Sequence, residues 1–451
     1  MPSAPRFRRS RPLVAALVLA LAAIGLLGPD RAARADRVGL NAQQLTNDLY
    51  SDPLRSLRLV ATAASLNAGE VRLPVGWGWI ESTPPVDGRH RYDWWRYDQL
   101  LLELARKGIR VQADIDGTPA FEVPARCLRG SQGAGMPEHP AWYGAFVRAF
   151  VDRYGPGGTL WRDYPDVPAR PVRRIELGNE QNHPYRWCTG APNGGEYARL
   201  VRSALDALGR DRPVAVITGG LYPLYAARGD ATVPDDRFLV QMRDADPTIL
   251  DDVDAIGLHD YGDQAGASAG DHAFPDATMV ELALTRWKLM MAGIPPWKPV
   301  AITETGIPGV PVLRDDGSVA VDADVGDDQR GQALVAATRR LLAADCGVSQ
   351  VQVHTLAGSM EVPPLDGYEG GIANPAFRLR MAEAFFGLAR LDGSLRPAGE
   401  VWRAFAATAP PAAGSTDECS SILRGFAVDD DLRAVHPEYY DAGGRLRTSA
   451  P

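Results

Sequence analysis

Two glutamates follow short apolar stretches of the sequence and lie among polar residues. Glu180 lies near the end of "RRIELGNEQN" (173–182), and Glu304 lies in "VAITETG" (300–306). Carboxylates and amides are costly to bury without partners, but they suit a ligand rich in hydroxyl groups. Two carboxylates facing each other could cleave a glycosidic bond, because one protonates the leaving oxygen while the other attacks or activates water.

Further polar and aromatic residues end the neighbouring apolar stretches and are candidates for substrate binding. These candidates are Arg72, Trp77, Trp79, Asp116, Asn179, His259, Tyr261 and His354. Alternation along a strand over 70–79 would put Trp77 and Trp79 on one face, where they either stack on sugar rings or pack in the core. We expect Glu176 to be structural and His259 to support the site through hydrogen bonds. Asp114 remains open between loop support and substrate contact, and Trp187 is a weaker candidate for a sugar platform.

Eight short β-branched or apolar runs alternate with longer amphipathic stretches. The predicted strands cover 37–41, 70–79, 109–116, 173–179, 214–220, 254–262, 300–306 and 350–358. Strands that are each followed by a helix favour an α/β fold, a parallel sheet closed into a (β/α)8 TIM barrel. The rival is an open doubly wound sheet, which is disfavoured because no G-x-G-x-x-G follows the first strand.

Helix signals separate these strands. Asp52 is a capping candidate before Pro53 at the first helical position, and Gly108 is expected to stop the helix before it. "PAFRLRMAEAFFGLARL" (375–391) is predicted to be the last barrel helix. After residue 409 the alternation is lost, so we predict one catalytic domain over 36–409 and a C-terminal tail over 410–451.

The first residues describe a secretory signal peptide. Four arginines precede the apolar run "LVAALVLALAAIGLL" (13–27), and Ala33-Arg34-Ala35 forms a cleavage site. We expect export with cleavage after Ala35, so that the mature chain begins at Asp36 and is not inserted in a membrane. The alternative is an uncleaved anchor, for which the apolar run is short.

Composition narrows the possible partners. The net charge is −8 and no basic run occurs beyond the N-terminus, which argues against nucleic acid as a partner. No CxxC pair or His-Cys cluster indicates zinc. We expect a monomer that binds carbohydrate and needs neither a metal nor another cofactor.

The four cysteines fit an oxidising compartment and allow three pairings. In a barrel, Cys127 and Cys188 would lie on one rim, in the loops after the third and fourth strands. Cys346 would end the seventh helix, where the tail could bring Cys419. We therefore favour Cys127–Cys188 and Cys346–Cys419.

The motifs together resemble the clan A retaining (β/α)8 glycoside hydrolases. "GNE" at 178–180 and "ITETG" at 302–306 look like the acid/base and nucleophile motifs of this clan, which follow strands four and seven. "VRLP" (71–74) and "HDY" (259–261) are similar to its second and sixth strands. Family 39 and its relatives are most similar, through "DGTPAF" and "GLARLDGSLRPAGEVWRAF". The likeness covers residues 37 to 408.

The resemblance implies a role for each matching residue. Glu180 would be the acid/base, Glu304 the nucleophile, and Asn179 the ligand of the sugar 2-hydroxyl. Arg72 and Tyr261 would hydrogen-bond Glu304 and keep it ionised. Glu180 should instead stay protonated, because a dry site and the charge of Glu304 favour the neutral acid.

Two positions depart from the clan pattern. Many members present a Trp after strand eight, where this chain has His354, and one branch has a His in the third strand, where it has "DIDGTPAF". We expect a secreted hydrolase that cleaves β-linked poly- or oligosaccharides by double displacement. A secreted carbohydrate-binding protein on an inactive barrel, or a transglycosylase using the same residues, is the alternative.

Overall fold

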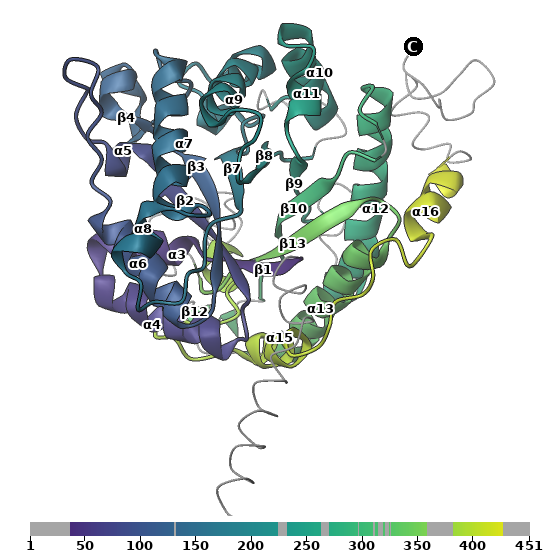
Figure 1. The fold of residues 1–451 in the computed structure, drawn as a ribbon. Helices are drawn as coiled ribbons and strands as arrows, with labels where there is room; N and C mark the ends of the chain where they lie inside the picture. Colours follow the sequence, from purple (N-terminus) through teal and green to yellow (C-terminus); the bar gives the residue numbers. More distant parts are fainter. Residues whose placement is uncertain are drawn as a thin grey trace, which may run out of the picture.

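The computed structural model describes residues 37–129, 132–223, 232–262, 270–295, 297–309, 312–313, 319–320, 324, 326–358 and 382–426. Eight parallel strands form the central sheet (Figure 1). They are β1 (Val38–Asn41), β2 (Glu70–Gly76), β3 (Arg110–Asp116), β7 (Arg174–Asn179), β8 (Ala215–Gly220), β9 (Ile256–His259), β10 (Val300–Thr305) and β13 (Val348–His354). The predicted eight strands are therefore confirmed.

The sheet closes on itself into the predicted barrel. Its strands are ordered β8-β7-β3-β2-β1-β13-β10-β9, and the two end strands meet through the parallel bridges Ile217–Ala255 and Leu221–Leu258. Backbone bonds from Leu221 N to Gly257 O and from His259 N to Leu221 O complete this seam. Closure brings the carboxyl ends of all eight strands to one mouth, where a barrel enzyme carries its site.

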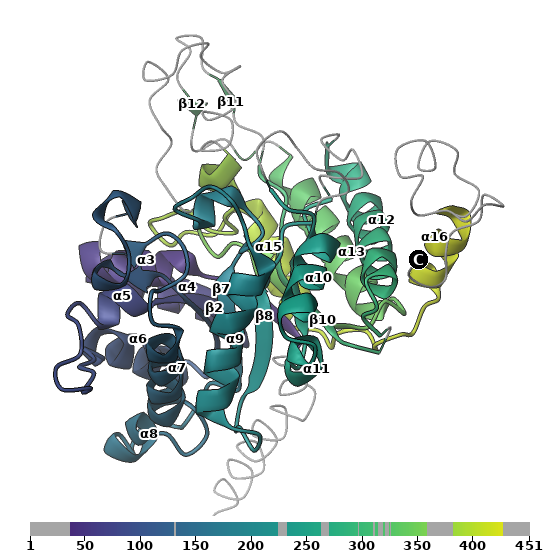
Figure 2. The same cartoon turned by 90° about the horizontal axis from the view of Figure 1, so that it is seen from above.

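Helices surround the barrel, as the view from above shows (Figure 2). The longer ones are α3 (Gln43–Ser51), α4 (Pro53–Ser65), α6 (Trp95–Arg106), α7 (Pro140–Tyr154), α9 (Gly194–Leu208), α10 (Asp235–Ala245), α12 (Gly270–Met291), α13 (Asp327–Ala343) and α15 (Pro397–Ala406). Asp52 caps α4 by accepting from Arg55 N at 3.0 Å, with Pro53 at the first position, as predicted. No helix among the described residues is long and apolar enough to cross a membrane.

The strands place apolar side chains against the helices and polar ones inside the barrel. In β2, Val71 and Leu73 belong to the core cluster, whereas Glu70 and Arg72 bond across the interior. Further polar interior residues are Gln112, Arg174, Glu176, Gln350 and Gln352. This period of two points alternate side chains of each strand into the barrel interior.

The second predicted strand ends earlier than expected. β2 stops at Gly76, and Trp77–Ile80 form a short helix, α5. Residues two apart lie on nearly opposite sides of a helix. The prediction that Trp77 and Trp79 share a face was therefore wrong.

In its described part, the helix expected over 375–391 ends at residue 385. Residues 382–385 are helical, but 386–389 run beside the segment after β13, where Leu388 N bonds Thr355 O and Ala389 N bonds Leu356 O. The last barrel helix is instead α15. Residues 375–381 lie outside the described part of the chain.

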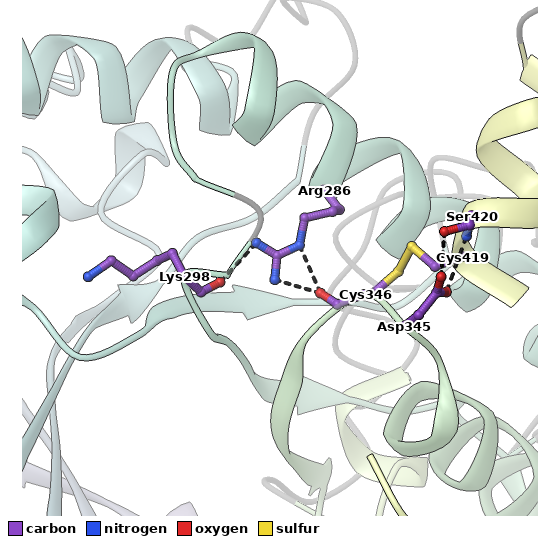
Figure 3. The surroundings of a disulfide bond; sticks show 6 residues. All are labelled: Arg286, Lys298, Asp345, Cys346, Cys419 and Ser420. Carbon is purple, nitrogen blue, oxygen red and sulfur yellow. Dashed lines mark hydrogen bonds between the residues drawn. A yellow bond between two sulfur atoms is a disulfide. The ribbon is translucent and has the colours of Figure 1, made fainter. Parts of the chain in front are cut away.

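Both predicted disulfides are present. Cys127–Cys188 joins the loops after β3 and β7, and Cys346–Cys419 joins the turn after α13 to α16 (Glu418–Phe426). Figure 3 shows Arg286 donating to the Cys346 carbonyl at 2.8 Å, and Ser420 bonding Asp345 beside the second disulfide. The tail is thus attached to the barrel as far as Phe426. The predicted signal peptide over 1–35 and the rest of the tail lie outside the described residues.

Candidate active site

Glu304 lies on β10 and is held by three side chains at the mouth of the barrel. Its Oε1 accepts from Arg72 Nη1 and from Asn41 Nδ2, each at 2.8 Å. Its Oε2 accepts from the Tyr261 hydroxyl at 2.7 Å. The carboxylate is almost fully buried, yet every donor stabilises its charged form.

These contacts keep Glu304 ionised. Burial alone would raise its pKa, but His259, Arg72, His354 and the Tyr261 hydrogen bond together lower the pKa to about 2. Glu304 is therefore charged at any pH at which the protein would work, as a nucleophile must be.

Arg72 links this carboxylate to the rest of the barrel. Its Nε lies 2.6 Å from Glu176 Oε2, and its Nη2 lies 3.3 Å from Asp114 and donates to Asn179 Oδ1 at 2.8 Å. Glu176 also accepts from Gly220 N at 2.8 Å and is completely buried. These contacts give Glu176 the structural role expected of it. Asp114 contacts Arg72 and also lines a cavity beside Glu304, so both of its proposed roles stay open.

Glu180 follows β7 in an unusual backbone conformation. Its φ is +52°, a region that non-glycine residues rarely occupy, and Gly178 before it has φ +87°. A Cβ at Gly178 would lie 2.3 Å from Gln181 Nε2. Backbone bonds from Glu180 N to Gly220 O and from His183 N to Glu180 O hold this turn. The tight turn directs the Glu180 side chain over the mouth.

Both oxygens of Glu180 have partners. Oε1 lies 2.9 Å from His259 Nδ1, and Oε2 accepts from the Tyr185 hydroxyl. Burial and the charge of Glu304 raise the pKa of Glu180, but the hydrogen bond and charge of His259, with the Tyr185 bond, lower it below its ordinary value. The expectation of a protonated Glu180 did not include these two donors, and both oppose the protonated form.

The two glutamates face each other across a short distance. One oxygen of each, together with a ring nitrogen of His259, lie within 4.8 Å of one another. Among the described residues these three could hold a metal ion. Arg72 lies 2.8 Å from Glu304, however, and already supplies positive charge at this position.

A polar cavity of about 150 Å³ opens beside Glu304. Arg72, Asn179, Trp79 and Asp116, four of the predicted binding residues, line it. Asp116 forms an ion pair with Arg186, which also lines the cavity. His259 and Tyr261 reach the two carboxylates instead, from β9 and the residues after it.

Trp77 and Trp187 are part of the packed interior. Trp77 is only 1% exposed, stacks on Phe146 and donates its Nε1 to Glu81 at 2.8 Å. It does not line the cavity beside Glu304, but it lines a second cavity together with Asp116 and Tyr185, so its assignment to substrate binding stays a prediction. Trp187 donates its Nε1 to Gln181 O at 2.7 Å and supports the turn after β7 rather than a sugar.

His354 occupies the end of β13. Its Nδ1 lies 3.2 Å from Asn41 Nδ2 and its Nε2 lies 3.4 Å from Glu383. Burial lowers the pKa of His354, but Glu383 and Glu304 outweigh this and raise it. The imidazole is 3% exposed, so its contacts are mainly with the protein.

Solved structures similar to this fold are known, although sequence comparisons find no relative. No family model and no curated protein matches the sequence. A monomeric beta-xylosidase from Caulobacter crescentus is 19% identical with a TM-score of 0.55, over 82% of this chain and 67% of its own. The chain has the fold of clan A (β/α)8 glycoside hydrolases.

Two other glycoside hydrolase structures are similar over the same region. The GH39 enzyme from Xanthomonas axonopodis pv. citri is 19% identical with a TM-score of 0.53, covering 82% of this chain and 65% of its own. A GH5_18 enzyme from Streptomyces cattleya in complex with GlcNAc is 16% identical with a TM-score of 0.53, covering 84% and 82%. The chain thus spans about two thirds of the length of the first two proteins.

Two contacts in this glycoside hydrolase fold were missed by the sequence reasoning. Asn41 ends the first strand, so the strand-end rule used for the other candidates could have found it. Tyr185 lies in the loop after β7, in the short 3-10 helix Pro184–Arg186, and no local pattern signals its bond to Glu180.

Proposed function

We propose that this protein is a secreted, monomeric glycoside hydrolase that cleaves β-glycosidic bonds of a poly- or oligosaccharide with retention and without a cofactor. The observation that carries the proposal is the pair Glu180 and Glu304, of which one oxygen each lies within 4.8 Å of the other. Retaining enzymes hold their carboxyl groups roughly 5–5.5 Å apart, and inverting enzymes about 6.5–9.5 Å apart. Three glycoside hydrolases of the same fold, one of them described as monomeric, support the reaction class.

In the first step, Glu304 attacks the anomeric carbon while Glu180 donates a proton to the glycosidic oxygen. The bond to the leaving sugar breaks and a glycosyl ester forms on Glu304. Asn41, Arg72 and Tyr261 hold the attacking carboxylate in place. Asn179 Oδ1 accepts from Arg72, and its Nδ2, which lies 3.5 Å from the Tyr185 hydroxyl, would donate to the sugar 2-hydroxyl.

In the second step, Glu180 takes a proton from water, which attacks the ester and releases the sugar. Before the first step, the charge of Glu304 partly offsets the lowering of the pKa of Glu180 by His259 and Tyr185. The ester has no charge, so the pKa of Glu180 falls once the ester forms, and Glu180 becomes a better base. One residue thereby serves both steps.

The test is the replacement Glu304→Ala, assayed on a panel of plant β-glycans and bacterial exopolysaccharides with product sizing. Loss of the nucleophile should abolish turnover. Added azide should restore part of the activity on an aryl glycoside, because it can enter the space left by the carboxylate. Glu400→Ala on α15, whose side chain is half-exposed, is the matched control and should remain fully active. Unimpaired hydrolysis by Glu304→Ala would refute the mechanism.

A further inference from the structure

A row of aromatic rings leads from the cavity beside Glu304 to the surface of the protein. Trp79 lines the cavity, and its ring centre lies 5.3 Å from that of Tyr50. The Arg96 guanidinium carbon lies 4.9 Å from the Tyr50 ring centre and 4.5 Å from that of Trp95. Exposure rises along the row, to 38% at Tyr50 and 56% at Trp95.

The row lies at the carboxyl end of the barrel. Tyr50 belongs to α3, which follows β1, while Trp79 belongs to α5 and Arg96 and Trp95 to the start of α6, which both follow β2. In Figure 1, α3, α5 and α6 lie on the same side of the barrel. The row is therefore continuous with the proposed site rather than an isolated surface patch.

Packing of the core does not account for the exposed rings. The interior contacts here are made by Tyr97 of α6, which is fully buried, and by Trp94 just before α6, which stacks on Phe146 and packs edge-on against Tyr154. Trp95, the next residue, presents its ring outward. A large exposed aromatic beside a binding cavity is typical of a recognition surface.

We propose that Trp79, Tyr50, Arg96 and Trp95 form a platform for the sugar rings that precede the one at the cleavage point. The inference rests on the proposed function and makes it more specific. The cavity is lined by Glu304 and Asn179, which contact the sugar that is retained on the enzyme, so the platform lies on that side of the bond. Arg96 covers one face of the Tyr50 and Trp95 rings, so the apolar faces of sugar rings pack on the uncovered parts of these rings while Arg96 donates to their hydroxyl groups. The substrate is thus a polysaccharide whose internal bonds are cleaved.

The test measures binding in the inactive Glu304→Ala protein by isothermal titration calorimetry. The probes are the β-1,4-linked disaccharide and hexasaccharide of xylose, glucose, mannose and galactose. We expect one hexasaccharide to bind at least about tenfold more tightly than its disaccharide, which corresponds to about 1.4 kcal/mol. Adding Trp95→Ala or Tyr50→Ala should remove most of this advantage, while Tyr50→Phe should retain it.

Trp297→Ala is the matched control, since Trp297 is 79% exposed but precedes β10 at the opposite end of the barrel. It should leave the advantage of the hexasaccharide unchanged, and melting curves should verify that each variant is folded. The platform is refuted if no hexasaccharide binds more tightly than its disaccharide. It is also refuted if Trp95→Ala and Tyr50→Ala weaken neither ligand, or both equally. Hydrolysis by the wild-type protein, measured in parallel, tests the proposed function separately.

Discussion

Each candidate catalytic carboxylate accepts a hydrogen bond from a different tyrosine hydroxyl. Tyr261 donates to Glu304 Oε2 at 2.7 Å, and Tyr185 donates to Glu180 Oε2. Each hydrogen bond lowers the pKa of the carboxyl group that accepts it. The two contacts are therefore a matched pair through which the two limbs of the pH profile can be changed separately.

We predict that Tyr261→Phe shifts the acid limb of kcat/KM to higher pH. Loss of the donor raises the pKa of Glu304 from about 2, so the nucleophile becomes ionised only at higher pH. Tyr185→Phe should instead move the alkaline limb to higher pH, because Glu180 then keeps its proton longer as pH rises. Profiles of kcat/KM report the free enzyme, the state described by this structure.

The wild-type protein and Trp297→Ala serve as references for these profiles. Since the pKa of Glu180 is lowered in the empty site, the wild-type kcat/KM should already fall on the acid side of neutrality. Shifts of both limbs by either variant, or a shift to lower pH, would contradict the assignment of one hydroxyl to each glutamate.

The backbone of Glu180 gives a second prediction at this scale. At the φ of +52° found for Glu180, a glycine would be unstrained, whereas an alanine would be strained. Glu180→Gly should therefore be more stable to unfolding than Glu180→Ala, by about 1 kcal/mol, while both lose activity.

The corresponding pair at Glu304 is the control, because that residue lies within β10. There the order should reverse, since glycine weakens a strand by roughly 0.5–1 kcal/mol relative to alanine. Thermal or denaturant unfolding of the four variants measures both differences. Equal stabilities of Glu180→Gly and Glu180→Ala would mean that no strain is stored at this position.

The sequence predicted where the two glutamates lie, but it did not predict the direction in which the pKa of Glu180 is shifted. Strand ends in a closed barrel must converge, so Glu180 and Glu304 could be paired from their positions alone. The pKa of Glu180 depends on opposing effects from His259, Tyr185 and Glu304, which only coordinates can weigh against one another.

At the scale of elements, the two disulfides have nearly equal spans but different surroundings. Cys127–Cys188 encloses the loop that carries Tyr185 to Glu180, whereas Cys346–Cys419 attaches α16 at the outside of the barrel. Their sequence separations are 61 and 73 residues, for which chain entropy gives each about 4 kcal/mol of stabilisation.

Replacing either pair of cysteines by serines should therefore lower the melting temperature by a similar amount. Only the Cys127→Ser and Cys188→Ser double variant should also lower kcat, because it releases the loop that holds Tyr185. The comparison of kcat below both melting transitions separates the two effects. A full kcat in this variant would show that the turn after β7 needs no restraint from the disulfide.

Most elements could be predicted from their hydrophobic period, and the two failures have physical causes. The chain forms a helix after Gly76, where Gly78 N donates to Gly117 O. In this helix, Trp77 and Trp79 lie on opposite sides. Residues 386–389 have a helical pattern but pair with the segment after β13, so tertiary contacts override local preference.

At the scale of the whole molecule, the start of the described chain is bound to its far end. Arg37 donates to Leu342 O at 2.8 Å and to Pro411 O at 2.6 Å. A mature chain that begins at Asp36 would keep these bonds. We predict that the protein recovered from the culture medium has the mass of residues 36–451, by intact mass spectrometry. Recovery only from membranes, with residues 1–35 attached, would contradict this.

Arg72 has a structural role that should keep it in the sequence even of homologues that have lost their activity. It contacts Asp114 and Glu176 as well as Glu304, and Glu176 is completely buried. Loss of Arg72 would leave buried carboxylates without their cation, at a cost of about 3–5 kcal/mol for a broken pair. A homologue that had lost its activity would therefore still be selected to keep Arg72. Tyr261 carries no such structural charge, so its disappearance, and not that of the arginine, should mark the lineages that no longer turn over sugar.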